Sequence, residues 1–256
     1  MIPYRLPAFL WPNVCDDLHR LGRDFDGGYL VSQRDVLGSD FLLSCGIFDD
    51  WSFERDFLKS REESTPLVAF DPTVGAGFFW GRVRSSLPRL AKPQMLYRDL
   101  KTLVDYYRFF SGPQRRHIKS LVGAPHFQNS VSIADFMEAE FSGLNGFCKI
   151  DVEGSEYRLF DELVEVKEKI TGLAIELHDI DLHLDRIERF LTDMDMTVIH
   201  CHPNNYGGLT TEGLPLVIEL TLSSASDATT TVSHLPHDSD MNNDRNGPVY
   251  FSTSDR

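Results

Sequence analysis

Short apolar runs alternate with helical stretches along most of this chain. Residues 41–46 form an apolar run that ends at a glycine, residues 51–60 have a helical pattern, and residues 66–70 form a second run that closes at Asp71. Apolar runs of strand length that alternate with helices are typical of a parallel sheet covered by helices. The pattern therefore predicts an α/β fold.

The second half of the chain continues this alternation. It predicts strands near 126–131 and over 146–152, 172–177, 196–202 and 216–222, and helices over 133–140, 156–169 and 183–194. Ser132 is placed to cap the first of these helices. The tail is rich in Ser, Thr, Asp and Asn, so we expect residues 223–247 to be loosely ordered, with regular structure again at 248–252.

Length and composition set broad limits. We expect one domain over residues 1–256, in which residues 72–125 form a basic, partly helical insertion or cap. No apolar run approaches the ~20 residues of a membrane-spanning helix, and the N-terminal residues lack the pattern of a signal peptide. The four cysteines form no CxxC pair, which is typical of reduced thiols in a cytoplasmic protein.

Charge is distributed unevenly along the chain. The net charge is −14, yet the segment from Pro72 to Pro125 holds ten basic and two acidic residues, a net +8 that leaves −22 for the rest. The overall value argues against a general nucleic-acid binder. The local excess indicates a surface that meets an anionic partner, or one that pairs with the protein's own acidic surface, for example across a homo-oligomer interface.

Polar residues follow the ends of the predicted strands, where parallel α/β sheets bind their ligands. Gly46 ends the first strand and allows close approach of a ligand to the backbone, and Asp71 ends the second and can accept both hydroxyls of a ribose. Three later strands end in pairs at positions i and i+2, which share one face. These pairs are Asp151 with Glu153, Glu176 with His178, and His200 with His202.

The motif around Asp151 resembles a known family signature. The run KIDVEGSEYRLF, which begins at Lys149, is similar to the Asp-x-Glu-Gly signature of the FkbM-type methyltransferases. Segments 22–29 and 42–54, the run IELH that ends at His178, and the stretch His200–Asn205 resemble a subgroup related to that family. The first turn departs from the usual Gly-x-Gly, because only Gly46 is present.

The resemblance implies a class I methyltransferase fold: a doubly wound, mostly parallel, seven-stranded Rossmann-like sheet that binds S-adenosylmethionine. It also implies a set of cofactor-binding residues, for which we take Asp26, Tyr29, Ser44, Gly46, Asp71, Ser130 and Asp151. The expected catalytic residues are Asp151, Glu176, His178 and His202.

A divalent cation is a further expectation. Methyl transfer to a hydroxyl needs an aligned acceptor that loses its proton, and a metal ion assists both. Asp151, Glu153 and His178 offer a mixed oxygen and nitrogen ligand set that suits Mg²⁺, Mn²⁺ or Zn²⁺. The strand of His202 lies two places from that of His178 in the usual order of this fold, about 10 Å away.

The acceptor that we expect is a sugar or glycan hydroxyl, or another small anionic acceptor, with no nucleic acid as partner. Arg115, Arg116, Asn204 and Asn205 are the candidate substrate contacts. Two other classes stay open: a metal-dependent hydrolase that uses the same carboxylates and imidazoles, and a non-catalytic binding module on a methyltransferase-like scaffold.

Overall fold

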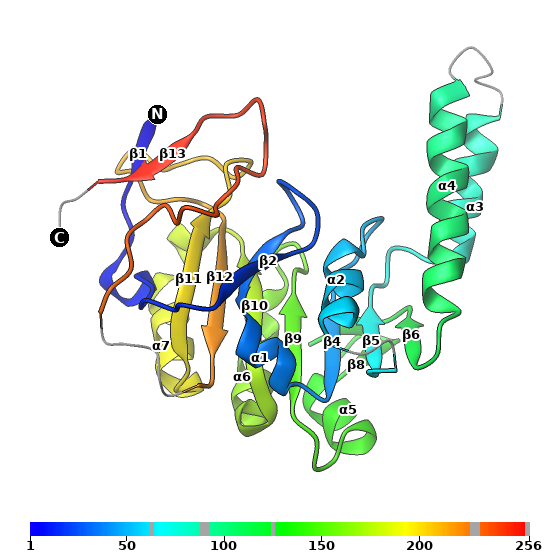
Figure 1. Cartoon of the computed structure of the whole chain (residues 1–256), viewed down its shortest axis with the longest axis horizontal. Helices are drawn as coiled ribbons and strands as arrows, with labels where there is room; N and C mark the ends of the chain where they lie inside the picture. Colours follow the sequence, from blue (N-terminus) through cyan, green and yellow to red (C-terminus); the bar gives the residue numbers. More distant parts are fainter. Residues whose placement is uncertain (62–63, 88–92, 124–125, 226–230, 254–256) are drawn as a thin grey trace.

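A seven-stranded sheet forms the centre of the computed structural model (Figure 1), which describes residues 1–61, 64–87, 93–123, 126–225 and 231–253. Its strands are β4 (Phe41–Cys45), β5 (Leu67–Phe70), β6 (Arg115–Ile118), β9 (Gly146–Ile150), β10 (Ile170–Leu177), β11 (Thr197–Pro203) and β12 (Ile218–Ser223).

The order of the strands confirms the fold class. Across the sheet they run β11-β12-β10-β9-β4-β5-β6, and β12 alone in this sheet is antiparallel to its neighbours. The chain builds outward from β4 in both directions, which makes the sheet doubly wound. This is the Rossmann-like arrangement of the class I methyltransferases, in which the last strand in the sequence, here β12, is inserted antiparallel between β10 and β11.

Alternate residues of each strand enter two different cores. In β4, Leu43 and Cys45 pack into one core, whereas Leu42 packs into the other. In β5, Val68 and Leu67 divide in the same way. Because side chains of a strand point alternately to opposite faces, a sheet that is apolar on both faces must be covered on both.

Helices supply the two coverings. Helices α5 (Ile133–Glu140), α6 (Phe160–Glu165) and α7 (Leu184–Met194) pack on one face, and α1 (Gln33–Gly38), α2 (Ser52–Ser60) and the inner ends of α3 (Ala76–Ser86) and α4 (Pro93–Phe110) pack on the other. Ser132 caps α5 as expected, since its hydroxyl accepts the Asp135 N–H. None of the described helices combines the length and apolar character that a membrane span needs.

Helices α3 and α4 form an antiparallel hairpin that stands out from the body (Figure 1). They lie within the basic segment 72–125, in the part between β5 and β6. The sequence pattern misplaced the strand that follows them: the third strand of the sheet is Arg115–Ile118, whereas Ser130–Val131 forms only a short pair, β8, with β7 (Leu121–Val122). The adjacent basic residues Arg115 and Arg116 concealed the strand, because an edge strand does not need an apolar run.

Small sheets tie the ends of the chain to the body. The hairpin of β2 (Leu18–Leu21) and β3 (Tyr29–Ser32) packs beside the main sheet, and β1 (Ile2–Tyr4) pairs in parallel with β13 (Tyr250–Ser252). The described part of the tail, 231–253, has little regular structure before β13. It runs over β11 and β12 and is held there by side-chain hydrogen bonds that are described below.

Candidate functional site

A cleft of about 750 Å³ opens where the chain reverses direction across the sheet, at the carboxyl ends of β4 and β9. Open α/β sheets bind their ligands at this position. The acidic residues of its lining are Asp26, Asp49, Asp50, Glu54, Asp71, Asp151, Glu153 and Glu176. The apolar part of the wall is formed by Ile47, Phe48, Phe53, Phe70, Leu121, Val122, Val152 and Val217.

The turns that form the cleft hold unusual backbone conformations. Gly46 has a φ of 82°, and a β-carbon there would lie 1.6 Å from the carbonyl oxygen of Asp151. The glycine is therefore required by the contact between two strand ends and not by a ligand. Phe48 and Glu153 have φ values of 39° and 52°, which are strained for residues with a β-carbon. Such strain is concentrated at functional sites.

Asp71 anchors one wall of the cleft. One carboxylate oxygen accepts the backbone N–H groups of Ile47 and Phe48 at 3.1 and 2.9 Å, and the other accepts the N–H and hydroxyl of Thr73 at 2.8 and 2.6 Å. Burial alone would raise the pKa of Asp71, but these bonds, led by the Thr73 hydroxyl, lower it. The Val74 N–H is a fifth donor to this carboxylate, at 3.3 Å. Its oxygens are therefore fully engaged within the chain, and the ribose contact expected at Asp71 finds no free acceptor.

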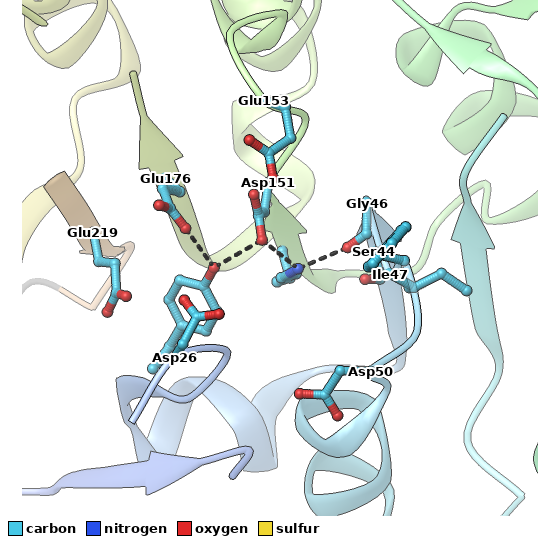
Figure 2. Close-up of polar contacts among 12 residues, drawn as sticks. Asp26, Ser44, Gly46, Ile47, Asp50, Asp151, Glu153, Glu176 and Glu219 are labelled. Atoms are coloured by element: carbon cyan, nitrogen blue, oxygen red, sulfur yellow. Dashed lines mark hydrogen bonds and ion pairs between the residues drawn. The ribbon is translucent and has the colours of Figure 1, made fainter. Parts of the chain in front are cut away.

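A network of polar contacts, drawn as dashed lines in Figure 2, joins side chains that line the cleft to one behind them. The Tyr29 hydroxyl lies 3.2 Å from both an Asp151 oxygen and a Glu176 oxygen, and Lys149 Nζ donates to Asp151 at 3.2 Å and to the Gly46 carbonyl at 2.7 Å. The network thus joins β3, β4, β9 and β10 at their ends. Tyr29 itself does not line the cleft, and acts by holding the carboxylates that do.

Charges in this network are strongly coupled. Burial raises the pKa of Glu176 well above its ordinary value, and the charges of Asp151 and Glu219 raise it further. Burial alone would lower the pKa of Lys149, but the neighbouring carboxylates, Asp151 first, raise it instead. Lys149 is therefore a fixed cation, and Glu176 takes up a proton readily. Asn204 donates to Glu176 at 2.8 Å, which places this predicted substrate residue at the cleft.

His178 is fixed by a carboxylate that the sequence patterns did not single out. Glu156 is fully buried at the start of a 3₁₀ turn, where it accepts the His178 backbone N–H at 2.6 Å and the Gly154 N–H at 2.8 Å. Glu156 Oε1, the oxygen that accepts the His178 backbone N–H, also lies 3.1 Å from His178 Nδ1. The opposite ring nitrogen, Nε2, faces the cleft, 3.5 Å from Glu153 and 3.8 Å from Glu176.

The pKa of His178 follows from this environment. Burial alone would lower it, but the hydrogen bond and charge of Glu156, followed by the charges of Glu153 and Asp151, raise it above its ordinary value. A carboxylate at Nδ1 also fixes the neutral ring with its proton on that nitrogen. The cleft-facing Nε2 is then a proton acceptor.

The expected metal site does not form. Asp151, Glu153 and His178 all line the cleft, but Asp151 is bound to Tyr29 and Lys149, the Glu153 side chain is 88% exposed, and His178 is bound to Glu156. Within the described residues, no group of three or more His, Cys, Asp or Glu side chains is arranged to hold a metal ion. We therefore withdraw this ligand set.

The histidine pair at the end of β11 lies outside the cleft. His200 Nε2 lies 2.8 Å from an Asp240 oxygen, and the same oxygen lies 3.4 Å from His202 Nδ1. Both rings are buried under the tail, and neither lines the cleft, where His202 was expected to act. Asn205, an expected substrate contact, donates to the tail carbonyls of Asp244 and Pro248 and does not line the cleft.

Several other predicted contacts are also placed away from the cleft. Arg115 and Arg116 lie at the amino end of β6, opposite to the edge that carries the cleft, and Arg116 pairs with Glu140 at 2.8 Å. Ser44 is buried and donates to Glu54, and Ser130 lies in β8 outside the lining. Of the expected cofactor residues, Asp26, Gly46, Asp71 and Asp151 line the cleft.

Comparison with known proteins identifies no family for this chain. No protein-family model matches it, and no curated protein matches it. Solved structures that resemble it include a precorrin-6y C5,15-methyltransferase from Geobacter metallireducens, at 12% identity and a TM-score of 0.39, which covers 75% of this chain and 85% of the other.

Two further neighbours are named for RNA substrates. One is a candidate tRNA methyltransferase from Streptococcus pneumoniae in complex with S-adenosyl-L-methionine, at 13% identity and a TM-score of 0.37, covering 75% of this chain and 72% of the other. The second is an rRNA methylase from Streptococcus thermophilus, at 10% identity and a TM-score of 0.39, covering 75% and 90%. At these TM-scores the substrates belong to those proteins alone.

These names nevertheless conflict with our sequence-based exclusion of nucleic acid, which we withdraw. The exclusion relied on the net charge of −14. Net charge sums over the whole surface, whereas binding depends on the local field, and this chain carries a segment of opposite sign.

Proposed function

We propose that this protein is an S-adenosylmethionine-dependent methyltransferase that transfers the methyl group to a hydroxyl. The observation that carries the proposal is the cleft: it lies at the switch point of a class I methyltransferase sheet and is lined by carboxylates and apolar side chains.

The residues of the cleft fit this cofactor. S-adenosylmethionine carries a sulfonium and an ammonium group, and acidic walls attract such a cation. Eight carboxylates line the cleft against the cations Arg23 and Lys149, of which Lys149 is committed to Asp151 and Gly46. The apolar wall formed by Phe48, Phe70 and Leu121 suits the adenine ring.

When bound, S-adenosylmethionine supplies a methyl group that a nucleophile can displace from sulfur. His178 Nε2 takes the proton of the acceptor hydroxyl as general base. Glu156 is the positioning residue, because its contact with Nδ1 orients the ring and stabilises the imidazolium that forms. Asn204 and Glu176 provide polar contacts beside that base.

The nature of the cleft also bears on the acceptor. Carboxylates surround His178, and Arg115 and Arg116 are distant, so we propose a neutral hydroxyl such as that of an uncharged sugar in place of the anionic acceptor. The hydrolase alternative depended on a metal held by Asp151, Glu153 and His178, and these side chains are not arranged as a metal-binding group in the part of the chain that the structure describes.

Calorimetry tests the cofactor assignment. S-adenosylmethionine should bind, and ATP should not. Asp151→Asn, which removes one cleft charge, should weaken the affinity for the sulfonium about tenfold, a change of about 1.4 kcal/mol, and should affect neutral-sulfur S-adenosylhomocysteine less. Asp161→Asn, an exposed acid on α6 outside the cleft, is the matched control. Failure of the folded wild-type protein to bind S-adenosylmethionine would overturn the assignment.

A further inference from the structure

The α3–α4 hairpin carries much of the apolar surface that the protein exposes. Of 17 large hydrophobic side chains exposed in the described part of the chain, six belong to this hairpin and its first turn beyond α3. They are Trp80, Leu87, Tyr97, Leu100, Val104 and Tyr107. Apolar side chains gathered on one element mark an interaction surface.

Four of these side chains form one stripe along α4. Tyr97, Leu100, Val104 and Tyr107 follow one another at intervals of three, four and three residues, and are 70%, 40%, 45% and 46% exposed. Such spacing places side chains along one side of a helix, as in the contact seam of paired helices. We call these four residues the outer stripe.

A different face of α4 already makes the internal contacts. Leu103, Tyr106 and Phe109 are buried in the core that joins the hairpin to the body. The helix therefore has two apolar faces, and only one of them is covered within the described residues. A helix that is apolar on two faces packs between two neighbours.

Charge beside the outer stripe has one sign. Both acids of α4 are engaged internally: Asp99 binds Arg82 and Ser86, and Asp105 binds Trp51 and Arg55. Three exposed basic side chains accompany the stripe: Arg98, Lys101 and Arg108. Arg98 lies 3.5 Å from Asp99, whereas Lys101 and Arg108 form no ion pair with any described residue.

We propose that the outer stripe is the docking site for an amphipathic helix of a partner protein whose apolar stripe is flanked by acidic residues. The stripe spans ten residue steps, so a helix of about 15 Å, three turns, covers it. Glutamates beside the partner's apolar stripe would meet Lys101 and Arg108, which gives the complex its orientation.

Other occupants fit less well. Two copies of this face would bring Lys101 and Arg108 of one chain against those of the other. A nucleic acid would leave the aliphatic centre of the stripe, Leu100 and Val104, without a matching surface. The inference goes beyond the proposed function, because the hairpin stands apart from the body (Figure 1) and docking needs no group of the cleft.

Designed peptides test the proposal. An 18-residue fluorescent amphipathic helix with a leucine stripe and glutamate flanks is compared, by anisotropy, with the same peptide carrying lysine flanks. The acidic peptide should bind the whole protein more tightly. Lys101→Glu with Arg108→Glu should reverse the preference, and Leu100→Ser with Val104→Ser should weaken the acidic peptide about tenfold or more.

Matched controls lie on other faces. Arg189→Glu on α7 and Leu144→Ser before β9, both exposed, should leave binding unchanged. Equal affinity for the two peptides, or no loss in folded stripe variants, would overturn the proposal. So would self-association in sedimentation that Leu100→Ser with Val104→Ser abolishes, which would identify a second copy, or displacement of the acidic peptide by an oligothymidylate. Thermal melts of each variant establish that it is folded.

Discussion

Two neighbouring regions at the carboxyl edge of the sheet hold the same pair of groups, an imidazole and a carboxylate, in different surroundings. Over β10, His178 is bound by Glu156 and presents Nε2 to a cleft. Over β11, His200 and His202 share Asp240 and are covered by the tail. We refer to these as the open pair and the sealed cluster.

Access, and not residue type, therefore separates a reactive group from a structural one in this protein. In the open pair, a fully buried carboxylate raises the pKa of an imidazole that lines the cleft. In the sealed cluster, burial lowers the pKa of His200, while Asp240 and Glu219 outweigh burial and raise that of His202. The charge of the sealed cluster is used to hold the tail on the sheet.

The largest expected effect separates the two regions by catalysis. His178→Ala should lower the methyl-transfer rate about 10²–10⁴-fold, the usual contribution of a general base. His202→Ala should leave the rate per folded molecule close to that of the wild type. Transfer from radiolabelled S-adenosylmethionine, with a hydroxyl acceptor found by screening, measures both. Equal losses in the two variants would contradict the distinction.

Stability should show the opposite order. Asp240→Ala leaves two buried imidazoles without their shared carboxylate and should lower the free energy of unfolding by about 3–5 kcal/mol, as when one partner of a buried pair is removed. Asp238→Ala removes an exposed carboxylate from the same segment and is the matched control. Urea denaturation at neutral pH gives both values, and similar midpoints would mean that Asp240 does not hold the tail.

Chemical labelling distinguishes the two regions without an acceptor. Diethyl pyrocarbonate should modify His178 about tenfold or more faster than His200 and His202, because labelling of the buried rings requires local opening of the tail. S-adenosylmethionine should slow only the modification of His178. Peptide mass spectrometry after timed quenching follows each histidine, and equal labelling rates would show that the tail does not seal the cluster.

The pKa of His178 gives a finer test of the role of Glu156. Glu156→Gln keeps the shape but removes the charge, and should lower that pKa by about one unit, a tenfold change in proton affinity. Carbon-13 NMR of the histidine rings measures it directly. A structural role alone would leave the pKa of His178 unchanged in a folded variant.

The sign of the pH effects follows from the raised pKa of His178. Its interaction with Glu156 adds stability below the ordinary value of 6.5, and this stability is lost as the pH rises through the folded pKa. The proton-accepting form exists above the same pKa, so the rate should rise there. In Glu156→Gln both transitions should move to lower pH.

Much of the fold was predictable from the sequence. Apolar runs such as 41–46 and 172–177 mark strands that are buried on both faces, and helical spacing marks the helices between them. These signals are local, because each is a pattern of apolar residues within a single strand or helix. Strand β6 was missed because Arg115 and Arg116 lie at an edge, where burial imposes no apolar pattern.

The sequence indicated which polar residues lie at the ends of the strands, but not which residues they contact. From the sequence alone, Asp151, Glu176 and His178 were expected at one edge of the sheet, since parallel strands end together. Tertiary packing set three contacts that the sequence did not indicate: Glu156 with His178, Asp71 with the N–H groups of Ile47 and Phe48, and Asp240 with the β11 histidines. Hydrogen bonds between segments 22 to 40 residues apart depend on how loops and tail pack, and no local pattern of the chain encodes that packing.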